Sequence, residues 1–456
     1  MVSAAEQLAS NLNFGAFAKA QDLKQRLWFT LGALLVYRLG TFIPLPGINA
    51  DAFAAAFKAQ SSGILGMFNM FAGGAIERLA IFALNIMPYI SASIIIQIMT
   101  SVSPKLEALK KEGESGRKQI NQYTRYLTVL LATLQAYGIA IGLEGSSSGA
   151  AGAIVNDPGW FFRFSTVITL VGGTMFLMWL GEQITQRGVG NGISLIIFAG
   201  IVAGLPTALA GLFELARAGS ISTPLLFALI LLMLSVVAAV VFIERAQRRL
   251  LIQYPKRQVG NRMSQGESSH LPLKLNSAGV IPPIFASSLL LLPITVAQFM
   301  GSGGGPGTEW LNSIVASLGL GQPLHMLLTA ALIIFFAFFY TALVFNPKET
   351  ADNLRKYGGF LPGIRPGEKT AEYIDYVLTR ITTVGALYLA AVCVLPEFLV
   401  SYAALPFYFG GTSLLIAVSV TMDTVAQVQS HLLAHQYEGL IKKAKLRGAT
   451  SNRGRR

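Results

Sequence analysis

The chain has 456 residues, of which 53% are hydrophobic and 12% are charged, and its mean hydropathy is +0.56. Soluble domains usually carry about a quarter charged residues, so this composition is typical of a membrane protein. The formal net charge is +13 at pH 7. Cys393 is the only cysteine, which excludes an internal disulfide and a cysteine-rich metal site.

Ten apolar segments predict ten transmembrane helices. Each is about as long as a helix must be to cross a bilayer core of ~30 Å. The segments lie near residues 28–45, 79–102, 122–143, 160–181, 193–213, 223–243, 276–298, 325–345, 378–400 and 406–427. No unbroken apolar core precedes the first of them, so we expect residues 1–26 to form an N-terminal segment without a removable signal peptide.

The basic residues predict the orientation of the chain. When the loops are assigned to alternate sides of the membrane, 29 of the 35 Lys and Arg residues fall on the side that holds both termini. Loops rich in Lys and Arg stay in the cytoplasm. We therefore expect a multi-pass protein with both termini in the cytoplasm.

The predicted helices divide into two sets of five, in residues 27–215 and 216–428. Because five is odd, two related sets would insert with opposite orientations, and a site or pore would lie between them. The parity permits this symmetry without demonstrating it. Between the first two helices, residues 61–74 are apolar but reach only ~21 Å as a helix, so they must be buried in protein, re-entrant or interfacial.

The second predicted helix contains polar residues. Within "NIMPYISASIIIQ", residues 85–97, Pro88 can kink the helix, and Ser91, Ser93 and Gln97 would place hydrogen-bonding groups in hydrocarbon. That helix should not face lipid all round.

Three basic regions are expected in the cytoplasm: loops at residues 244–275 and 346–377, and a tail at residues 429–456. Both loops are large enough to form a docking surface. In "PGIRPG", two Pro-Gly pairs stiffen a turn that directs Arg365 outward, where a carboxylate or phosphate of a partner could bind it.

Residues that carry catalysis or bind metals are scarce. Among four histidines, His431 and His435 share a helical face, but no nearby carboxylate or thiol completes a metal site, and we expect both on a solvated helix end. The glycine-rich run at residues 301–307 follows no strand and has no lysine after it, unlike a phosphate-binding loop. We expect neither enzymatic activity nor a metal or cofactor.

Few charged residues lie well inside the predicted helices. We expect Arg38, Arg163, Glu182 and Asp423 near helix ends, where long side chains reach the interface and acids face water. An ion-coupled carrier would place charge near the middle of the membrane, so this scarcity weighs against a transporter.

Long motifs along the chain resemble those of the SecY family, the channel-forming subunits of the bacterial Sec protein translocase. The resemblance runs from about residue 20 to residue 445. Its motifs are "FNMFAGGA", "IFALNIMPYISASIIIQ", "KKEGESGRKQINQYTRY", "GTMFLMWLGEQIT", "GNGIS", "HLPLK", "FYTALVFNPKETADNL", "PGIRPG" and "FYFGGTSLLI".

The resemblance implies a fold class: an all-α membrane protein with ten transmembrane helices in two pseudo-symmetric, inverted halves of five. The halves surround an hourglass pore, and a short re-entrant helix at about residues 61–77 plugs its outer funnel. The plug residues would be Ile64, Leu65, Met67, Phe68, Asn69, Met70 and Phe71.

The resemblance also implies a pore ring and a lateral gate. Aliphatic side chains would seal the waist by excluding water. The matching residues are Ile86, Ile90, Ile197, Ile281, Ile284 and Ile416. By spacing alone, Ile86 and Ile90 indicate core packing more often than pore lining. At the gate, a hydrogen bond between Gln97 and Asn276 would favour closure.

Partners follow from the resemblance as well: the SecE and SecG subunits, the SecA motor ATPase, the ribosome, signal peptides and unfolded polypeptides, and membrane lipids. Arg257, Arg262 and Arg365 would dock the motor or the ribosome. Two positions depart from the family: Asn85 stands where Gly is frequent, and Asn261 stands where relatives carry a second Arg.

The function that the resemblance implies is a passive channel in the bacterial plasma (inner) membrane. It would export unfolded secretory polypeptides and release transmembrane segments sideways into lipid. The alternative is a secondary transporter of a small solute, which ten helices and inverted halves also suit. An intramembrane protease would need a serine-histidine pair or two aspartates inside the helices, and neither is visible.

Overall fold

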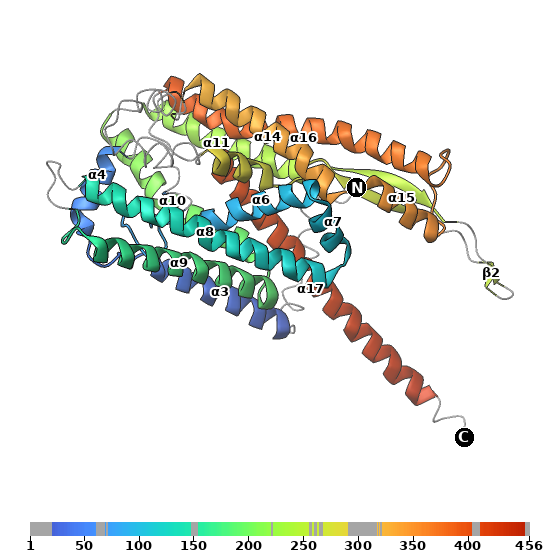
Figure 1. The fold of residues 1–456 in the computed structure, drawn as a ribbon. Coiled ribbons are helices and arrows are strands. Elements are labelled where there is room, and N and C mark those ends of the chain that lie inside the picture. Colours follow the sequence, from blue (N-terminus) through green and yellow to red (C-terminus); the bar gives the residue numbers. More distant parts are fainter. Residues whose placement is uncertain are drawn as a thin grey trace.

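The computed structural model shows a bundle of long helices that extend largely in one direction (Figure 1). The structure describes residues 21–60, 69, 72–146, 154–219, 222–254, 258–259, 262–263, 268–290, 317, 319, 322–403 and 411–451.

Helices dominate the first part of the chain, up to residue 219. They are α3 (Gln21–Gly40), α4 (Ala50–Gln60), α6 (Met87–Val102), α7 (Pro104–Lys111), α8 (Glu114–Ser146), α9 (Trp160–Arg187) and α10 (Gly192–Arg217).

The second part, from residue 222, adds further helices and two pairs of strands. The helices are α11 (Thr223–Arg245), Ile281–Leu290, α14 (Pro323–Val344), α15 (Pro347–Lys356), α16 (Glu368–Ala403) and α17 (Gly411–Ser451). The strands are β1 (Gln247–Gln253), β2 (Gln258–Val259), β3 (Arg262–Met263) and β4 (Ser268–Lys274).

Each of the ten predicted transmembrane segments contains a described helix. Seven of these helices are long and apolar enough to cross a membrane, and α6 and Ile281–Leu290 are shorter apolar helices. Helix α3 is not among the seven, since Lys24, Arg26 and Arg38 lie within its 20 residues. An all-α membrane fold is thus confirmed.

The second predicted segment begins later than expected. Residues 81–86 form turns, and α6 starts at Met87 rather than near residue 79. Leu79 and Asn85 adopt positive φ angles of 46° and 48°, which a helix does not accept. Pro88 lies in the first turn of α6, where its missing N–H costs nothing, so it starts the helix and does not kink it.

The two basic loops contain more regular structure than expected. In residues 244–275, β1 and β4 form an antiparallel ribbon in which Gln247 is opposite Lys274. In residues 346–377, α15 and the first turns of α16 replace most of the loop. Gln253 and Phe360 exchange two backbone hydrogen bonds, which join the ribbon to the second loop.

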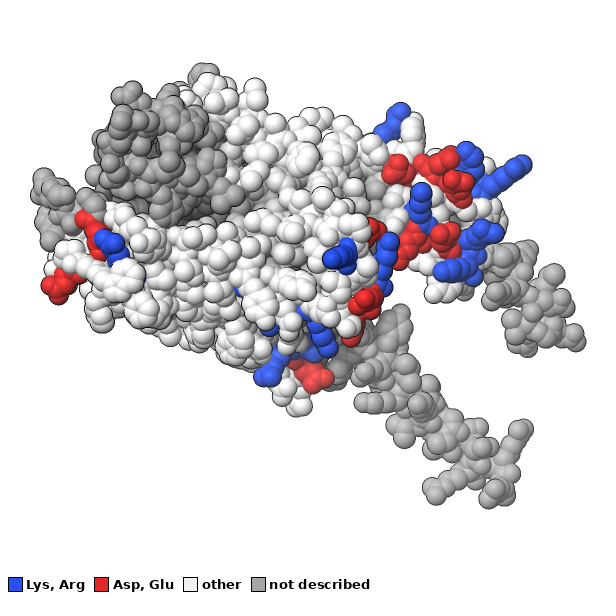
Figure 2. Space-filling view, viewed as in Figure 1, with Lys and Arg blue, Asp and Glu red and all other residues white. Residues whose placement is uncertain are grey.

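The surface is apolar along the bundle and charged at its ends. Figure 2 shows charged side chains gathered mainly at the end that carries α7 and α15, while the middle of the visible face is almost uncharged. Phe161, Phe242 and Trp28 are among the most exposed large apolar side chains. Such a band favours contact with lipid, as in a multi-pass membrane protein.

The main core cluster joins residues from α3, α6, α9, α10, α11, Ile281–Leu290, α14, α16 and α17. Glycines allow the closest approaches. At Gly173 in α9, an added Cβ would collide with the carbonyl oxygen of Ile81 and lie 3.2 Å from Cδ1 of Phe82. A Cβ added at the neighbouring Gly172 would have no atom within 4 Å. Helix α9 therefore supports the turns that lead into α6.

This difference gives a matched test. We expect Gly173→Ala to destabilise the protein by about 1–3 kcal/mol, because overpacking displaces the turn at Ile81. Gly172→Ala should be neutral or stabilising, because alanine favours a helix over glycine. Thermal unfolding of both variants in detergent checks the prediction, and equal unfolding temperatures would contradict it.

Candidate functional site

A small cavity of about 20 Å³ lies inside the bundle. It is lined by Asn85, Ile86, Met87, Ile90, Ile197, Ile284, Ser287, Thr412 and Ile416. These residues come from α6 and the turn before it, α10, the helix Ile281–Leu290 and α17. Its volume is on the scale of a single water molecule.

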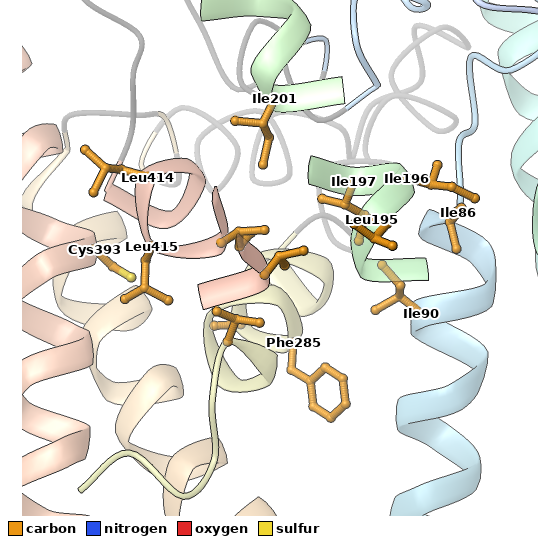
Figure 3. Packing of buried hydrophobic residues seen from close by; sticks show 14 of the residues in the cluster. Ile86, Ile90, Leu195, Ile196, Ile197, Ile201, Phe285, Cys393, Leu414 and Leu415 are labelled. Carbon is orange, nitrogen blue, oxygen red and sulfur yellow. The ribbon is translucent and has the colours of Figure 1, made fainter. Parts of the chain in front are cut away.

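Five of the six predicted ring residues line this cavity, all except Ile281. Ile281 is partly buried and packs against the same core cluster. Figure 3 shows buried side chains of α6, α10 and α17 converging, with Ile86 and Ile90 beside Ile197. Ile86 is 1% exposed and Ile416 is fully buried. We call these five isoleucines the constriction.

The constriction is apolar and its margin is weakly polar. None of the nine lining side chains carries a charge, and Ser287, Thr412 and Asn85 supply the polar atoms. A narrow passage lined in this way resists wetting, because water and ions lose hydrogen bonds on entering it. Branched aliphatic side chains can still shift to admit a larger group.

The predicted plug segment falls mostly outside the described residues. Ile64, Leu65, Met67, Phe68, Met70 and Phe71 all lie there. Asn69 is described, and its side-chain oxygen accepts a hydrogen bond from the backbone N–H of Glu77 at 2.9 Å. Its carbonyl accepts one from the N–H of Gly74 at 2.8 Å.

Helix α3 holds the C-terminal end of this segment. The hydroxyl of Tyr37 donates to the carbonyl of Ala72 at 3.3 Å, and Nη1 of Arg38 donates to the carbonyl of Gly73 at 2.7 Å. Gly73 has a φ of 65°, and an added Cβ would lie 3.0 Å from Nη1 of Arg38. Arg38 lies in the last turn of α3, as predicted, and its guanidinium also binds this segment.

The predicted gate hydrogen bond between Gln97 and Asn276 is not present among the described residues. Nδ2 of Asn276 donates to Glu244 at 2.7 Å and to the carbonyl of Gly279 at 3.1 Å. Nε2 of Gln97 donates to Ser93 one turn earlier in α6, at 3.1 Å. Asn276 thus anchors the start of the segment leading to Ile281–Leu290 onto α11.

Of the three predicted docking arginines, Arg365 is the one whose side chain lies within the described part of the structure. Arg365 is exposed, in a turn whose Gly363 and Gly367 have φ angles of 83° and 109°. Its carbonyl accepts a hydrogen bond from the hydroxyl of Thr370 at 2.9 Å. The exposure of Arg365 agrees with the expected outward turn, and its role in docking stays a prediction. Arg262 lies in β3 with its side chain outside the described part, and Arg257 lies outside it entirely.

The sequence did not predict two arginine–glutamate ion pairs. Arg125 binds Glu182 through two hydrogen bonds, of 2.6 and 3.2 Å, which join α8 to α9. Arg163 binds Glu144, with 2.6 Å between Nη2 and Oε2. Arg163 and Glu182 keep 36% and 24% of their side chains exposed, and the pairing with Glu144 and Arg125 is an addition to the predicted positions near helix ends. Both are arginine–carboxylate pairs, in which the planar guanidinium matches the geometry of the carboxylate.

A third pair lies inside the second part of the chain. Nδ1 of His325 in α14 is 2.6 Å from Oε1 of Glu397 in α16, and the two side chains are 7% and 10% exposed. No periodicity links residues 72 positions apart, so sequence reasoning had no signal for it. Among the described residues no group of three metal-ligating side chains occurs.

The fold itself resembles solved channels. The structure of a protein-conducting channel matches with a TM-score of 0.65 at 16% identity, over 91% of this chain and 93% of that chain. Sec61 in the canine ribosome-channel complex from the endoplasmic reticulum matches with a TM-score of 0.61 at 16% identity, over the same shares. The fold class is therefore that of membrane-embedded channels.

Sequence comparison identifies the family. The SecY family profile matches residues 80–425. The protein translocase subunit SecY of Escherichia coli (strain K12) is 58% identical over 427 residues, which cover 94% of this chain and 96% of that protein. The chain belongs to the SecY family of protein translocase subunits, which are not enzymes.

Proposed function

We propose that this chain forms the closed state of a translocation channel whose constriction is the path of unfolded polypeptides through the membrane. One observation carries the proposal: isoleucines from four elements, spread over 330 positions from Ile86 to Ile416, meet around one narrow cavity. Membership of the SecY family supports the same function.

An apolar constriction suits this task because it seals without recognising a sequence. At rest it excludes water and ions by dewetting. The seal matters because each charge that leaks across the membrane dissipates about 2.3 kcal/mol per 100 mV. During transport, isoleucines offer no directed hydrogen bond, so they contact any passing side chain without binding it tightly.

The alternative of a secondary transporter lacks support from the site. A transporter would present charged or strongly polar groups to its solute near the middle of the membrane. The described lining of the cavity carries no charge. The family, too, consists of translocase subunits.

For the opening movement we propose that the halves at residues 27–215 and 216–428 separate, with a lateral exit between α6 and α8 of the first half and the helix Ile281–Leu290 and α14 of the second. Ile90 of α6 and Ile284 of the helix Ile281–Leu290 meet at the constriction, which supports an exit that is continuous with the pore. Gln97 and Asn276 do not bond to each other in this closed state, so closure of the proposed gate relies on the aliphatic side chains of the constriction.

We further propose a bacterial plasma membrane location with both termini in the cytoplasm. The charged end of the bundle in Figure 2, with α7, α15 and the β1–β4 ribbon, would then be the cytoplasmic docking face for a SecA motor or a ribosome. A structural neighbour, Sec61 in the canine ribosome-channel complex, supports the second partner. SecE and SecG are the proposed membrane subunits, and the plug would fill the outer funnel.

Polar substitution of the constriction tests the proposed seal. We expect Ile416→Asn to destabilise the closed state by about 1–3 kcal/mol, since a buried amide there lacks partners, and to raise the leaking fraction roughly 5- to 150-fold. Ion flux through vesicles that contain the assembled complex measures this. Ile416→Leu keeps the apolar lining and should remain tight. Equal flux in both variants would refute the seal.

Charge reversal tests the docking face. We expect Arg365→Glu to lower motor-driven export at limiting motor concentration by about tenfold, the effect of ~1.4 kcal/mol of lost binding. Lys348→Glu makes the same charge change at an exposed position of α15 in the same loop, and should have a smaller effect. Undiminished export by the Arg365 variant, with the complex assembled, would remove that residue from docking.

A further inference from the structure

Two described side-chain hydrogen bonds connect the part of the chain before residue 219 to the part after residue 222. The backbone N–H of Gly190 donates to Oε1 of Gln427 at 2.8 Å in a partly buried position. Nζ of Lys110 donates to the carbonyl of Leu343 at 3.4 Å in an exposed position. Each of the six described ion pairs, in contrast, lies within one part. The bond to Gln427 is the shorter and better shielded connection.

Gly190 belongs to the turn of residues 188–191, between α9 and α10. Successive backbone N–H groups of this turn have partners in three helices. The N–H of Gly188 donates to Ile184 of α9 at 2.8 Å, and that of Val189 donates to the hydroxyl of Thr30 in α3 at 3.1 Å. The next one donates to Gln427 of α17. The turn is therefore hydrogen-bonded to α9, α3 and α17.

The turn approaches α17 closely because residue 190 is glycine. Gly190 has a φ of 90°, and an added Cβ would lie 2.9 Å from Leu195 and 3.2 Å from the hydroxyl of Thr424. Next to Gly190, the buried side chains of Leu23, Val189 and Leu432 form a cluster with Leu27 and Val428, while Gln427 itself is exposed on one side. The junction is thus packed as well as hydrogen-bonded.

This junction joins two helices that each carry one constriction residue, α10 in the first part of the chain and α17 in the second. Helix α10 starts at Gly192, directly after the turn, and carries Ile197. Helix α17 carries Gln427 and, eleven residues earlier, or ~16 Å along the helix, Ile416. A bond that fixes Gln427 to the turn therefore fixes how far along its axis α17 lies relative to α10.

We propose that Gln427 is a positioning residue: by accepting the N–H of Gly190 it holds α17 in register with α10, and so keeps Ile416 opposite Ile197 in the closed constriction. The inference rests on the proposed function, since it takes the constriction as the seal. The contact joins the proposed cytoplasmic ends of α10 and α17, and the opening movement has to strain or break it.

Two substitutions separate the hydrogen bond from the packing. Gln427→Met keeps a long unbranched side chain and removes the acceptor, whereas Gln427→Glu keeps an acceptor in the same place. In vesicles with the assembled complex, we expect the Met variant to leak ions roughly 5- to 30-fold more than the unaltered protein, for the loss of one hydrogen bond. The Glu variant should show an ion flux close to that of the unaltered protein.

Hydrogen exchange provides a readout that does not depend on transport. The amide of Gly190 should lose protection in the Met variant and keep it in the Glu variant. An unchanged flux in the Met variant, or equal flux in the Met and Glu variants, would overturn the proposal. Precursor transport by the unaltered protein is measured in the same vesicles. Its absence would instead refute the proposed function, while the exchange data would still test the bond.

Discussion

The arrangement of the whole chain depends on bringing aliphatic side chains from distant helices into contact at one narrow point. In a bilayer the hydrophobic effect does not drive this contact, because lipid tails are as apolar as isoleucine. Close backbone approach has to do so. Cβ atoms added at Gly173, Gly192 or Gly411 would collide with carbonyl oxygens of Ile81, Gly181 and Val392. These glycines therefore set the positions from which the constriction residues project.

Polar groups are arranged so that the constriction stays uncharged. Near the helix ends, Arg125 and Arg163 are each bound by a carboxylate, and His325 is bound by Glu397. His325 and Glu397 are buried, and either group without its partner would lose its hydrogen bonds to water at a free-energy cost. Tyr37 and Arg38 donate hydrogen bonds to the backbone carbonyls of residues 72 and 73. These bonds fix the segment that leads into the constriction. Polar contacts outside the constriction thus hold the segments that position its apolar residues.

The sequence predicted the membrane-spanning helices well, because hydropathy reports lipid contact directly. The constriction was predicted only through the family resemblance, since the spacing of Ile86 and Ile90 alone suits any packed helix. The late start of α6 was missed because the positive φ angles at Leu79 and Asn85 fall on residues that are not glycine. Pairs such as His325 and Glu397 were missed because packing of two helices, and no local pattern, brings them together.

Photo-crosslinking tests the central claim most directly. A photoreactive amino acid at Ile416 is compared with one at Val425, which lies nine residues further along α17 and so on its opposite face, and is 42% exposed. A secretory precursor is stalled midway by a folded C-terminal domain. We expect adducts with the precursor at position 416 and none at 425. Equal adducts at both positions, or none at 416 with the precursor stalled on the complex, would contradict it.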